Sequence, residues 1–429
     1  MAFPTSSLTN NQVHKEGNRA FVYDSALGVW DQVTETDRTD TKIITGDVTT
    51  SGNLTVTGDF VPSTPLSNRN LIINGGMQVW QRATATTTAA GNAYKTVDRW
   101  KFDGTTDGVL TSEKHDMSLA EIDATGHGSA LQLDVTTADA SLAAGQYAYF
   151  RQYIEAQNLQ HLQYGTANAK TITLSFWVKS NKTGIYAAGI LKPDTTAYKI
   201  FDEYTINAAD TWEKKTITFT PTAGSTTLIT NSGGIINNDN GQGFEVHFGL
   251  AWGSTNGSGT AQTWSTSSAY YASTNHVNWM DSTSNNFYLT GVQLEVGSNA
   301  TPFEHRSYTE EFFMCNRYYT RIANDYHGQL ILCWAVGTSR WYGECRTKNA
   351  LRATPTVVWG GSGSWSTHKS QTSGVNHTST TAPTIANWTE GFYHVTLDSG
   401  NNFTGLTDGG GPYLATFGGA RILSLDAEL

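Results

Sequence analysis

Apolar and polar residues alternate strictly in several runs through the middle of the chain. Every second residue is apolar across residues 172–178 and again across residues 244–252. Successive side chains of a β-strand point to opposite faces of the sheet, so this period of two predicts half-buried antiparallel strands. Loops rich in Gly and Asn separate such runs. The fold class that we expect is therefore all-β, with a β-sandwich over residues 67–303.

The apolar positions change parity inside one of these runs. Phe287 and Leu289 are apolar before Gly291, and the even-numbered Val292 continues the pattern after it. A slip of one residue at a glycine is the signature of a β-bulge, because the extra residue moves every later side chain to the other face. We therefore expect a bulge at Gly291.

One segment has the spacing of an α-helix. Ser307, with Glu310 three residues later, matches a capping box, in which the two residues satisfy each other's backbone N–H groups. An apolar stripe at helical spacing is formed by Tyr308, Phe312, Cys315 and Tyr319. We expect a linking helix within residues 304–320 whose stripe packs on the sandwich. Packing against copies of itself on a trimer axis is the alternative.

A second β-rich unit occupies residues 321–429. Its final run alternates in the same way, and the residues on one face are Leu423, Leu425, Ala427 and Leu429. We expect this run to be a strand that ties the end of the chain into a C-terminal β-sandwich head.

Residues 1–45 form a small module of their own. Two β-rich runs, 19–24 and 29–33, are separated by a short turn segment, which predicts a hairpin. The large aromatic residues of these runs are Phe21, Tyr23 and Trp30. So short a segment has too little core to bury these rings alone. We therefore expect the module to dock onto another protein.

Residues 46–66 contain a six-residue repeat. Glycine recurs at Gly46, Gly52 and Gly58, and an apolar residue stands two positions after each glycine. These apolar residues are Val48, Leu54 and Phe60. One apolar residue in six cannot form a core within one chain, whereas three copies wound about an axis could bury them. The repeat predicts the short β shoulder of a homotrimer, and the alternative is a flexible linker rich in Gly and Thr.

The composition narrows the choice of partners. Only 15% of the residues are charged, and the formal net charge is −10. A negative chain is repelled by phosphate backbones, so we expect no nucleic-acid partner. No basic amphipathic stretch and no apolar run of roughly 18 residues is present, so we expect no membrane insertion. The start of the sequence lacks the regions of a secretion signal, which favours synthesis in a cytoplasm.

Catalytic motifs are absent from the sequence. It contains no HExxH zinc motif, no GxSxG elbow and no phosphate-binding loop. Glycosidases need two carboxylates across a sugar cleft. Candidate pairs are Glu121 with Asp123 and Asp202 with Glu203, but adjacent acids are more simply solvated strand or turn residues. The scattered Cys315, Cys333 and Cys345 are expected to be buried thiols. We therefore expect no enzyme.

Several separate segments resemble a known family. They are residues 70–82 with 97–100, residues 171–180, residues 207–218 and residues 287–303. Together they resemble the jelly-roll domain of tailed-bacteriophage tail fibres and capsid fibres, and they are also similar to the jelly rolls of carbohydrate-binding modules. Residues 12–30 resemble short virion-attachment modules. Residues 303–319 are similar to the joint before fibre head domains.

This resemblance implies a structural virion protein. Residues 1–45 would be the virion anchor that contacts phage tail or capsid proteins, and the C-terminal head would be exposed to the host. Carbohydrate-binding modules of this shape often hold a structural calcium through an Asp in the last strand. The matching positions here are Thr290 and Gly291, without that Asp. We therefore expect no metal and no cofactor.

Aromatic residues in polar, loop-rich sequence are candidates for stacking on sugar rings. In the sandwich region they are Trp252, Trp264, Tyr271 and Trp279. In the C-terminal unit they are Trp359, Trp365 and Trp388. The alternative is that these rings fill sandwich cores or trimer interfaces.

The function that we expect is that of a fibre or spike subunit of a tailed-phage virion that recognises a host-surface glycan. Three weak sites per trimer would raise avidity by multivalent binding. Two alternatives stay open. One is a glycan-depolymerising spike enzyme, and the other is a purely structural capsid or tail decoration without receptor binding.

Overall fold

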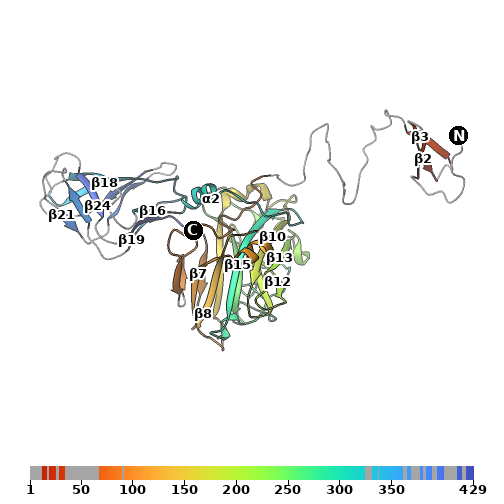
Figure 1. The fold of residues 1–429 in the computed structure, drawn as a ribbon, viewed down its shortest axis with the longest axis horizontal. Helices are drawn as coiled ribbons and strands as arrows, with labels where there is room; N and C mark the ends of the chain where they lie inside the picture. Colours follow the sequence, from red (N-terminus) through yellow and green to blue (C-terminus); the bar gives the residue numbers. More distant parts are fainter. Residues whose placement is uncertain are drawn as a thin grey trace. The chain divides into compact units, whose positions relative to one another are not determined.

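The computed structural model divides the chain into two compact units, Met1–Val61 and Pro62–Leu429 (Figure 1). The residues that the structure describes are 12–16, 19–25, 29–33, 67–88, 91–323, 331–336, 338–360, 365–368, 377–379, 383–388, 394–400, 413–417 and 422–429. Val48, Leu54 and Phe60 of the predicted shoulder lie outside these residues. The trimeric shoulder therefore stays a prediction.

The first unit contains a small antiparallel sheet. Its strands, in order across the sheet, are β1 (Val13–Glu16), β2 (Arg19–Asp24) and β3 (Val29–Val33). The predicted hairpin of residues 19–33 is confirmed. Strand β1 pairs with β2 on the edge of β2 that does not contact β3. Phe21 is buried, and the rings of Tyr23 and Trp30 lie 5.3 Å apart between centroids.

Two six-stranded antiparallel sheets dominate the second unit (Figure 1). The first sheet has the order β13 (Glu213–Phe219), β10 (Ile172–Lys179), β15 (Asn286–Val296), β8 (Ser129–Thr137), β7 (Val109–Asp116), β4 (Ala85–Thr88). The second sheet has the order β12 (Tyr198–Ile206), β11 (Gly184–Lys192), β14 (Gln242–Trp252), β9 (Tyr147–Glu155), β6 (Lys101–Gly104), β5 (Gly91–Ala93).

Side chains from both sheets meet in one core. Phe176 of β10 packs edge-on against Phe248 of β14, with 4.9 Å between ring centroids. Trp100 is fully buried beside Phe150 of β9, at 6.2 Å. Because inward-facing residues of the two sheets interdigitate, the sheets form a sandwich. The predicted all-β class is confirmed.

Strand β14 is buried on both faces. Phe248 faces the core, but Glu245 and His247 on the opposite face are also buried, at 1% and 0% exposure. The reason is that residues 253–278 fold over the outer face of the second sheet, where Ser265 exchanges backbone hydrogen bonds with Lys199. The prediction of a half-buried strand is therefore wrong for β14.

Short helical segments lie between the strands. They are α1 (Leu119–Thr125) and the 3₁₀ turns η2 (Ala156–Leu162), η3 (Ala223–Ser225), η4 (Ser232–Gly234) and η5 (Trp279–Asp281). The sequence pattern did not predict α1. Its Glu121 forms a capping box with Ser118 and also accepts hydrogen bonds from Lys179 and Trp212. This carboxylate thus has a structural role.

The predicted β-bulge is confirmed. Ser175 pairs with Gln293 and Trp177 pairs with Thr290, so β15 has one residue more than β10 at Gly291. Gly291 has a φ of +60°, which favours glycine. A Cβ at this position would approach the ring of His127 to 2.4 Å, so the bulge also makes room for a buried imidazole.

The burial of His127 predicts that the stability of the folded chain depends on pH. Burial, assisted by the positive charges of His305 and Lys214, lowers the pKa of His127 to about 4. An unfolded histidine has a pKa near ~6.5, so between these values the unfolded chain binds a proton that the folded chain does not. The free energy of unfolding should therefore fall with pH from about 6.5 to about 4, by up to ~1.4 kcal/mol per pH unit from this group.

Urea unfolding followed by tryptophan fluorescence at a series of pH values measures this slope. The variant His127→Gln should have a shallower slope than the unchanged protein across the same pH range. Identical slopes in the two proteins would show that His127 does not titrate as its burial requires.

Helix α2 (Tyr308–Cys315) begins at the predicted capping box of Ser307 and Glu310, which is confirmed. Its predicted apolar stripe is only partly correct. Cys315 is buried, but Tyr308 is 57% exposed and stacks on Phe312. Tyr319 belongs to the following strand. The inward face of α2 is instead completed by Glu311, which is buried because it pairs with Arg306.

The C-terminal part contains two further sheets. One has the order β16 (Tyr319–Ala323), β25 (Ile422–Asp426), β19 (Thr356–Gly360). The other, here the head sheet, has the order β21 (His377–Ser379), β20 (Trp365–His368), β24 (Tyr413–Phe417), β17 (Ile331–Val336), β18 (Arg340–Arg346), β23 (His394–Asp398), β22 (Thr384–Trp388). The predicted final strand is confirmed as β25, but it ends at Asp426, so Ala427 and Leu429 lie after it.

The end of the chain is bound to the sandwich through buried charges. Glu428 pairs with Arg99 and with Arg82, whose side chains are 1% and 7% exposed. Arg352 donates to the backbone carbonyls of Ala427 and Asn240. These bonds hold β25 and the residues after it against the sandwich.

Candidate functional site

Two predicted glycan-binding residues lie in the sandwich core. Trp264 is 1% exposed and donates to the carbonyl of Thr220, and Trp279 is 0% exposed and donates to the carbonyl of Asn286. A sugar can stack only on a ring face that solvent reaches. These two residues therefore cannot provide a stacking surface, and they fill the core.

Trp252 and Tyr271 belong to an aromatic cluster on the outer face of the second sheet. Trp252 stacks on Tyr271 and on Tyr149, in each case with 4.9 Å between centroids. Trp252 is only 4% exposed, because residues 253–278 cover this face. Its ring faces are thus occupied by other rings of the same chain.

Buried charges lie beside this cluster. Arg151 pairs with Glu245 at 2.6 Å and with Asp103 at 2.5 Å. Burial opposes the charge of Glu245, but His247 and Arg151 outweigh it and lower the pKa of Glu245. Burial lowers the pKa of His247. These buried charges therefore pair with one another beside the aromatic cluster.

The predicted aromatic residues of the C-terminal part lie on three strands. Trp359 is in β19 and Trp365 is in β20, but their side chains lie outside what the structure describes. Trp388 ends β22 and is partly buried. The glycan contacts assigned to these three residues stay predictions.

A different pair of aromatic residues lies on the head sheet, and one of its two rings is exposed. Trp334 of β17 stands directly opposite Tyr342 of β18, and their ring centroids lie 6.2 Å apart at an interplanar angle of 32°. Trp334 is 44% exposed, and the nearby Val336 is also 44% exposed. The neighbouring Ala335 and Trp341 point to the other face and are buried. The sequence reasoning missed this pair.

Polar groups border the two rings. Arg340 donates two hydrogen bonds to the carboxylate of Asp398, which pairs in register with Tyr342. The guanidinium also lies 5.0 Å from the ring of Tyr342. The hydrogen bond from Arg340 lowers the pKa of the Asp398 carboxyl, although burial opposes it. We call Trp334, Val336, Arg340, Tyr342 and Asp398 the aromatic patch.

The aromatic patch has the parts that sugar recognition needs. Neighbouring strands present two rings side by side, and aromatic faces attract the C–H groups of a pyranose. Fixed charged groups at the edge can exchange hydrogen bonds with hydroxyls and orient the ligand. Since neighbouring residues on a strand alternate between faces, the two rings point to the same side.

A groove runs along α2. Two pockets, of 640 and 500 Å³, share Ile73, Asn158, Phe313 and Met314 and therefore adjoin. Other residues lining the larger pocket are Ser67, Asn68, Leu71, His161, Glu304 and Glu310. We call this hollow the α2 groove.

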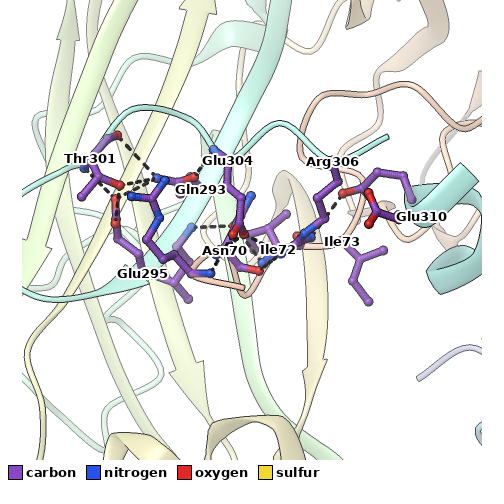
Figure 2. A network of polar contacts seen from close by, with 12 residues as sticks. Asn70, Ile72, Ile73, Gln293, Glu295, Thr301, Glu304, Arg306 and Glu310 are labelled. Carbon is purple, nitrogen blue, oxygen red and sulfur yellow. Dashed lines mark hydrogen bonds and ion pairs between the residues drawn. The ribbon is translucent and has the colours of Figure 1, made fainter. Parts of the chain in front are cut away.

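A polar network forms the back of the α2 groove (Figure 2). Arg306 pairs with Glu304 and Glu311 and donates to the carbonyl of Ile72. Glu304 also accepts hydrogen bonds from the backbone N–H groups of Arg69 and Asn70. Burial raises the pKa of Glu304, but the backbone N–H donors and Arg306 outweigh it, so the net shift is downward. The network therefore fixes residues 70–73 against the segment that precedes α2.

Of the two carboxylate pairs considered in the sequence, three members accept hydrogen bonds within the chain, and Asp123 is exposed. Glu121 is bound as described above. Asp202 accepts a hydrogen bond from Gln262, and Glu203 accepts one from Asn275. Within the described ranges, no group of three or more His, Cys, Asp or Glu side chains has the arrangement of a metal site. In the same residues no helix is long and apolar enough to cross a membrane.

Comparisons with known proteins give a distant likeness. No protein-family model matches the chain, and no curated protein does. The enzymatically active domain of tailspike protein 4 of bacteriophage CBA120 is similar over 53% of this chain and 21% of its own, at 11% identity and a TM-score of 0.26. The chain thus spans only about a fifth of that tailspike.

Two carbohydrate-binding modules are similar as well. The family 11 module of a Clostridium thermocellum cellulosomal cellulase matches 50% of this chain and 100% of its own, at 12% identity and a TM-score of 0.26. TmCBM61 in complex with β-1,4-galactotriose matches 54% and 100%, at 10% identity and a TM-score of 0.26. Sequence identities and TM-scores this low carry no argument about the function of this chain.

Proposed function

We propose that the chain is a structural subunit of a tailed-phage fibre or spike, and that it binds a glycan of the host surface through the aromatic patch. The observation that carries the proposal is the exposed ring of Trp334, which lies beside the half-buried ring of Tyr342 on the head sheet. Large rings are normally buried, and an exposed ring with fixed aromatic and polar neighbours is typical of a binding surface. The virion role is supported by the sequence features of residues 1–66.

The proposed subunit acts as a homotrimer located on the tail or capsid surface, after synthesis in the host cytoplasm. One open patch offers a sugar two rings and a few hydrogen bonds, so a single contact is weak. Three patches on one trimer, and several trimers on one particle, make the attachment strong by avidity. The proposal assigns no catalytic role to the chain.

A binding assay tests the proposal. The full-length protein is applied to an immobilised panel of purified bacterial lipopolysaccharides and capsular polysaccharides. The unchanged protein should bind at least one of them, and Trp334→Ala should weaken that binding about tenfold per site, because a ring contact of ~1.4 kcal/mol corresponds to a factor of ten.

The matched control is Leu119→Ala, which also removes an exposed apolar side chain, 86% exposed, but from α1. It should bind like the unchanged protein. Equal binding by Trp334→Ala and the unchanged protein would remove the aromatic patch from the proposal. Shortening of the polysaccharide during incubation would instead favour the depolymerase alternative.

A further inference from the structure

We propose that the α2 groove is an interface between copies of this chain, and that a neighbouring copy fills it in the homotrimer. The inference rests on the proposed trimer, and it names the surface that the copies share. It comes from three observations: the exposure of apolar side chains on α2, the position at which the chain enters the second unit, and the rigid back of the groove.

Helix α2 exposes large rings on two sides. Phe313 is 48% exposed and forms a wall of the groove, whereas Tyr308 is 57% exposed and does not line it. Leu71, Ile73 and Met314 continue the apolar lining around Phe313. In a three-fold ring each copy contacts its two neighbours through two different surfaces. The Tyr308 side of one copy and the groove of the next supply these two surfaces.

The α2 groove lies close in sequence to the hexad repeat. Ser67 and Asn68 line the α2 groove, and Ser67 is the first described residue after the hexad repeat. The last apolar residue of that repeat, Phe60, precedes Ser67 by seven positions. Seven residues span at most about 25 Å. If three copies associate at the repeat, the length of the chain therefore limits the distance between each Phe60 and the Ser67 end of its α2 groove to about 25 Å.

The groove is formed before a partner arrives. Arg306 binds the carbonyl of Ile72 and pairs with Glu304 and Glu311, which are themselves largely buried (Figure 2). The strands and α2 thus hold Ile73 and Phe313 at a fixed separation. A preformed surface loses little conformational freedom on association, which favours a specific contact.

The solution mass of the full-length chain tests the interface. The unchanged protein should have a mass of about 140 kDa by light scattering, three times the chain mass of 46.6 kDa. Phe313→Asp places a charge in the groove, and it should shift dissociation of the trimer to a protein concentration at least tenfold higher. Circular dichroism should show unchanged folding, because the Phe313 side chain is half exposed.

A second variant separates this inference from the proposed trimer and glycan binding. Leu54→Asp changes the hexad repeat and leaves the groove intact. If Leu54→Asp dissociates the trimer but Phe313→Asp does not, the groove is no interface, and the trimer stands. A monomeric unchanged protein overturns both the proposed homotrimer and the proposed interface at the α2 groove. The binding assay with Trp334→Ala then still tests the proposed glycan binding. A loss of polysaccharide binding by a trimeric Phe313→Asp would assign the groove to a sugar instead.

Discussion

The substitution Glu428→Gln is expected to lower the free energy of unfolding of the Pro62–Leu429 unit by about 3–5 kcal/mol, the usual cost of removing one partner of a buried ion pair. The side chain of Glu428 is 4% exposed and lies against Arg99 and Arg82. Glutamine has nearly the same shape, so the change removes the charge and leaves the packing in place.

The reason for so large an effect is the environment of Arg99. Its side chain is 1% exposed, and its guanidinium lies 3.4 Å from the ring centroid of Tyr318. Burial opposes the charge of this guanidinium, but the Glu428 carboxylate outweighs burial and raises the pKa of Arg99. Without that carboxylate, the positive charge stays buried and loses its main counter-charge.

Urea unfolding followed by circular dichroism measures the effect, and Glu344→Gln is the matched control. Glu344 is an exposed residue of β18, where loss of a surface carboxylate changes stability by less than about 0.5 kcal/mol. If the two variants have the same stability, the buried pair does not hold the end of the chain to the sandwich.

The second large effect is expected from Trp279→Ala, which should lower the free energy of unfolding by about 3–5 kcal/mol. The indole is fully buried next to Phe287, at 6.4 Å between centroids, and its N–H is bonded to the carbonyl of Asn286. Truncation leaves a cavity and removes one of the two hydrogen bonds to the Asn286 carbonyl, which keeps the bond from Ser180. The cavity is the main cause of the expected loss.

Trp334→Ala is the contrasting variant, since it removes the same side chain from a position that is 44% exposed. It should change stability by less than about 1 kcal/mol. Thermal or urea unfolding of the two variants compares them directly. If Trp279→Ala kept full stability and lost glycan binding instead, the assignment of Trp279 to the core would fail.

Much of the fold was predictable because local patterns have local causes. The even-numbered residues 172–178 are apolar because they belong to the core, although Thr173 and Ser175 on the other face of β10 are buried too. The parity change at Gly291 follows from one inserted residue. The capping box of Ser307 and Glu310 depends on a spacing of three residues. Each of these features is decided by neighbours along the chain, so the sequence alone displays it.

The glycan-binding residues were harder to predict because burial depends on distant segments. Trp252 was a reasonable candidate, but residues 253–278 fold back over its strand and cover its ring. The sequence pattern places Trp334 and Ala335 on opposite faces of β17, but it does not indicate that the face of Trp334 is the exposed one. Which face is open depends on packing that the alternation does not specify.

The stripe on α2 was mispredicted for a related reason. A glutamate inside a helix is normally solvated, yet Glu311 faces inward because Arg306 and the backbone N–H of Asn74 bind it. These partners lie outside the helix, and Asn74 is 237 positions away. Helical periodicity alone therefore favoured Phe312 and Tyr308 for the inner face.

The network behind the α2 groove has a mechanical consequence. Arg306 and Asn70 are 236 positions apart, yet the guanidinium donates to the carbonyl of Asn70 and pairs with Glu304 (Figure 2). These contacts therefore connect the first and the last segment of the sandwich. Tension that is applied to the chain near Ser67 can pass directly to α2 through these contacts. The stretch of chain between Asn70 and Glu304 is then bypassed, which protects the sandwich from unfolding under load.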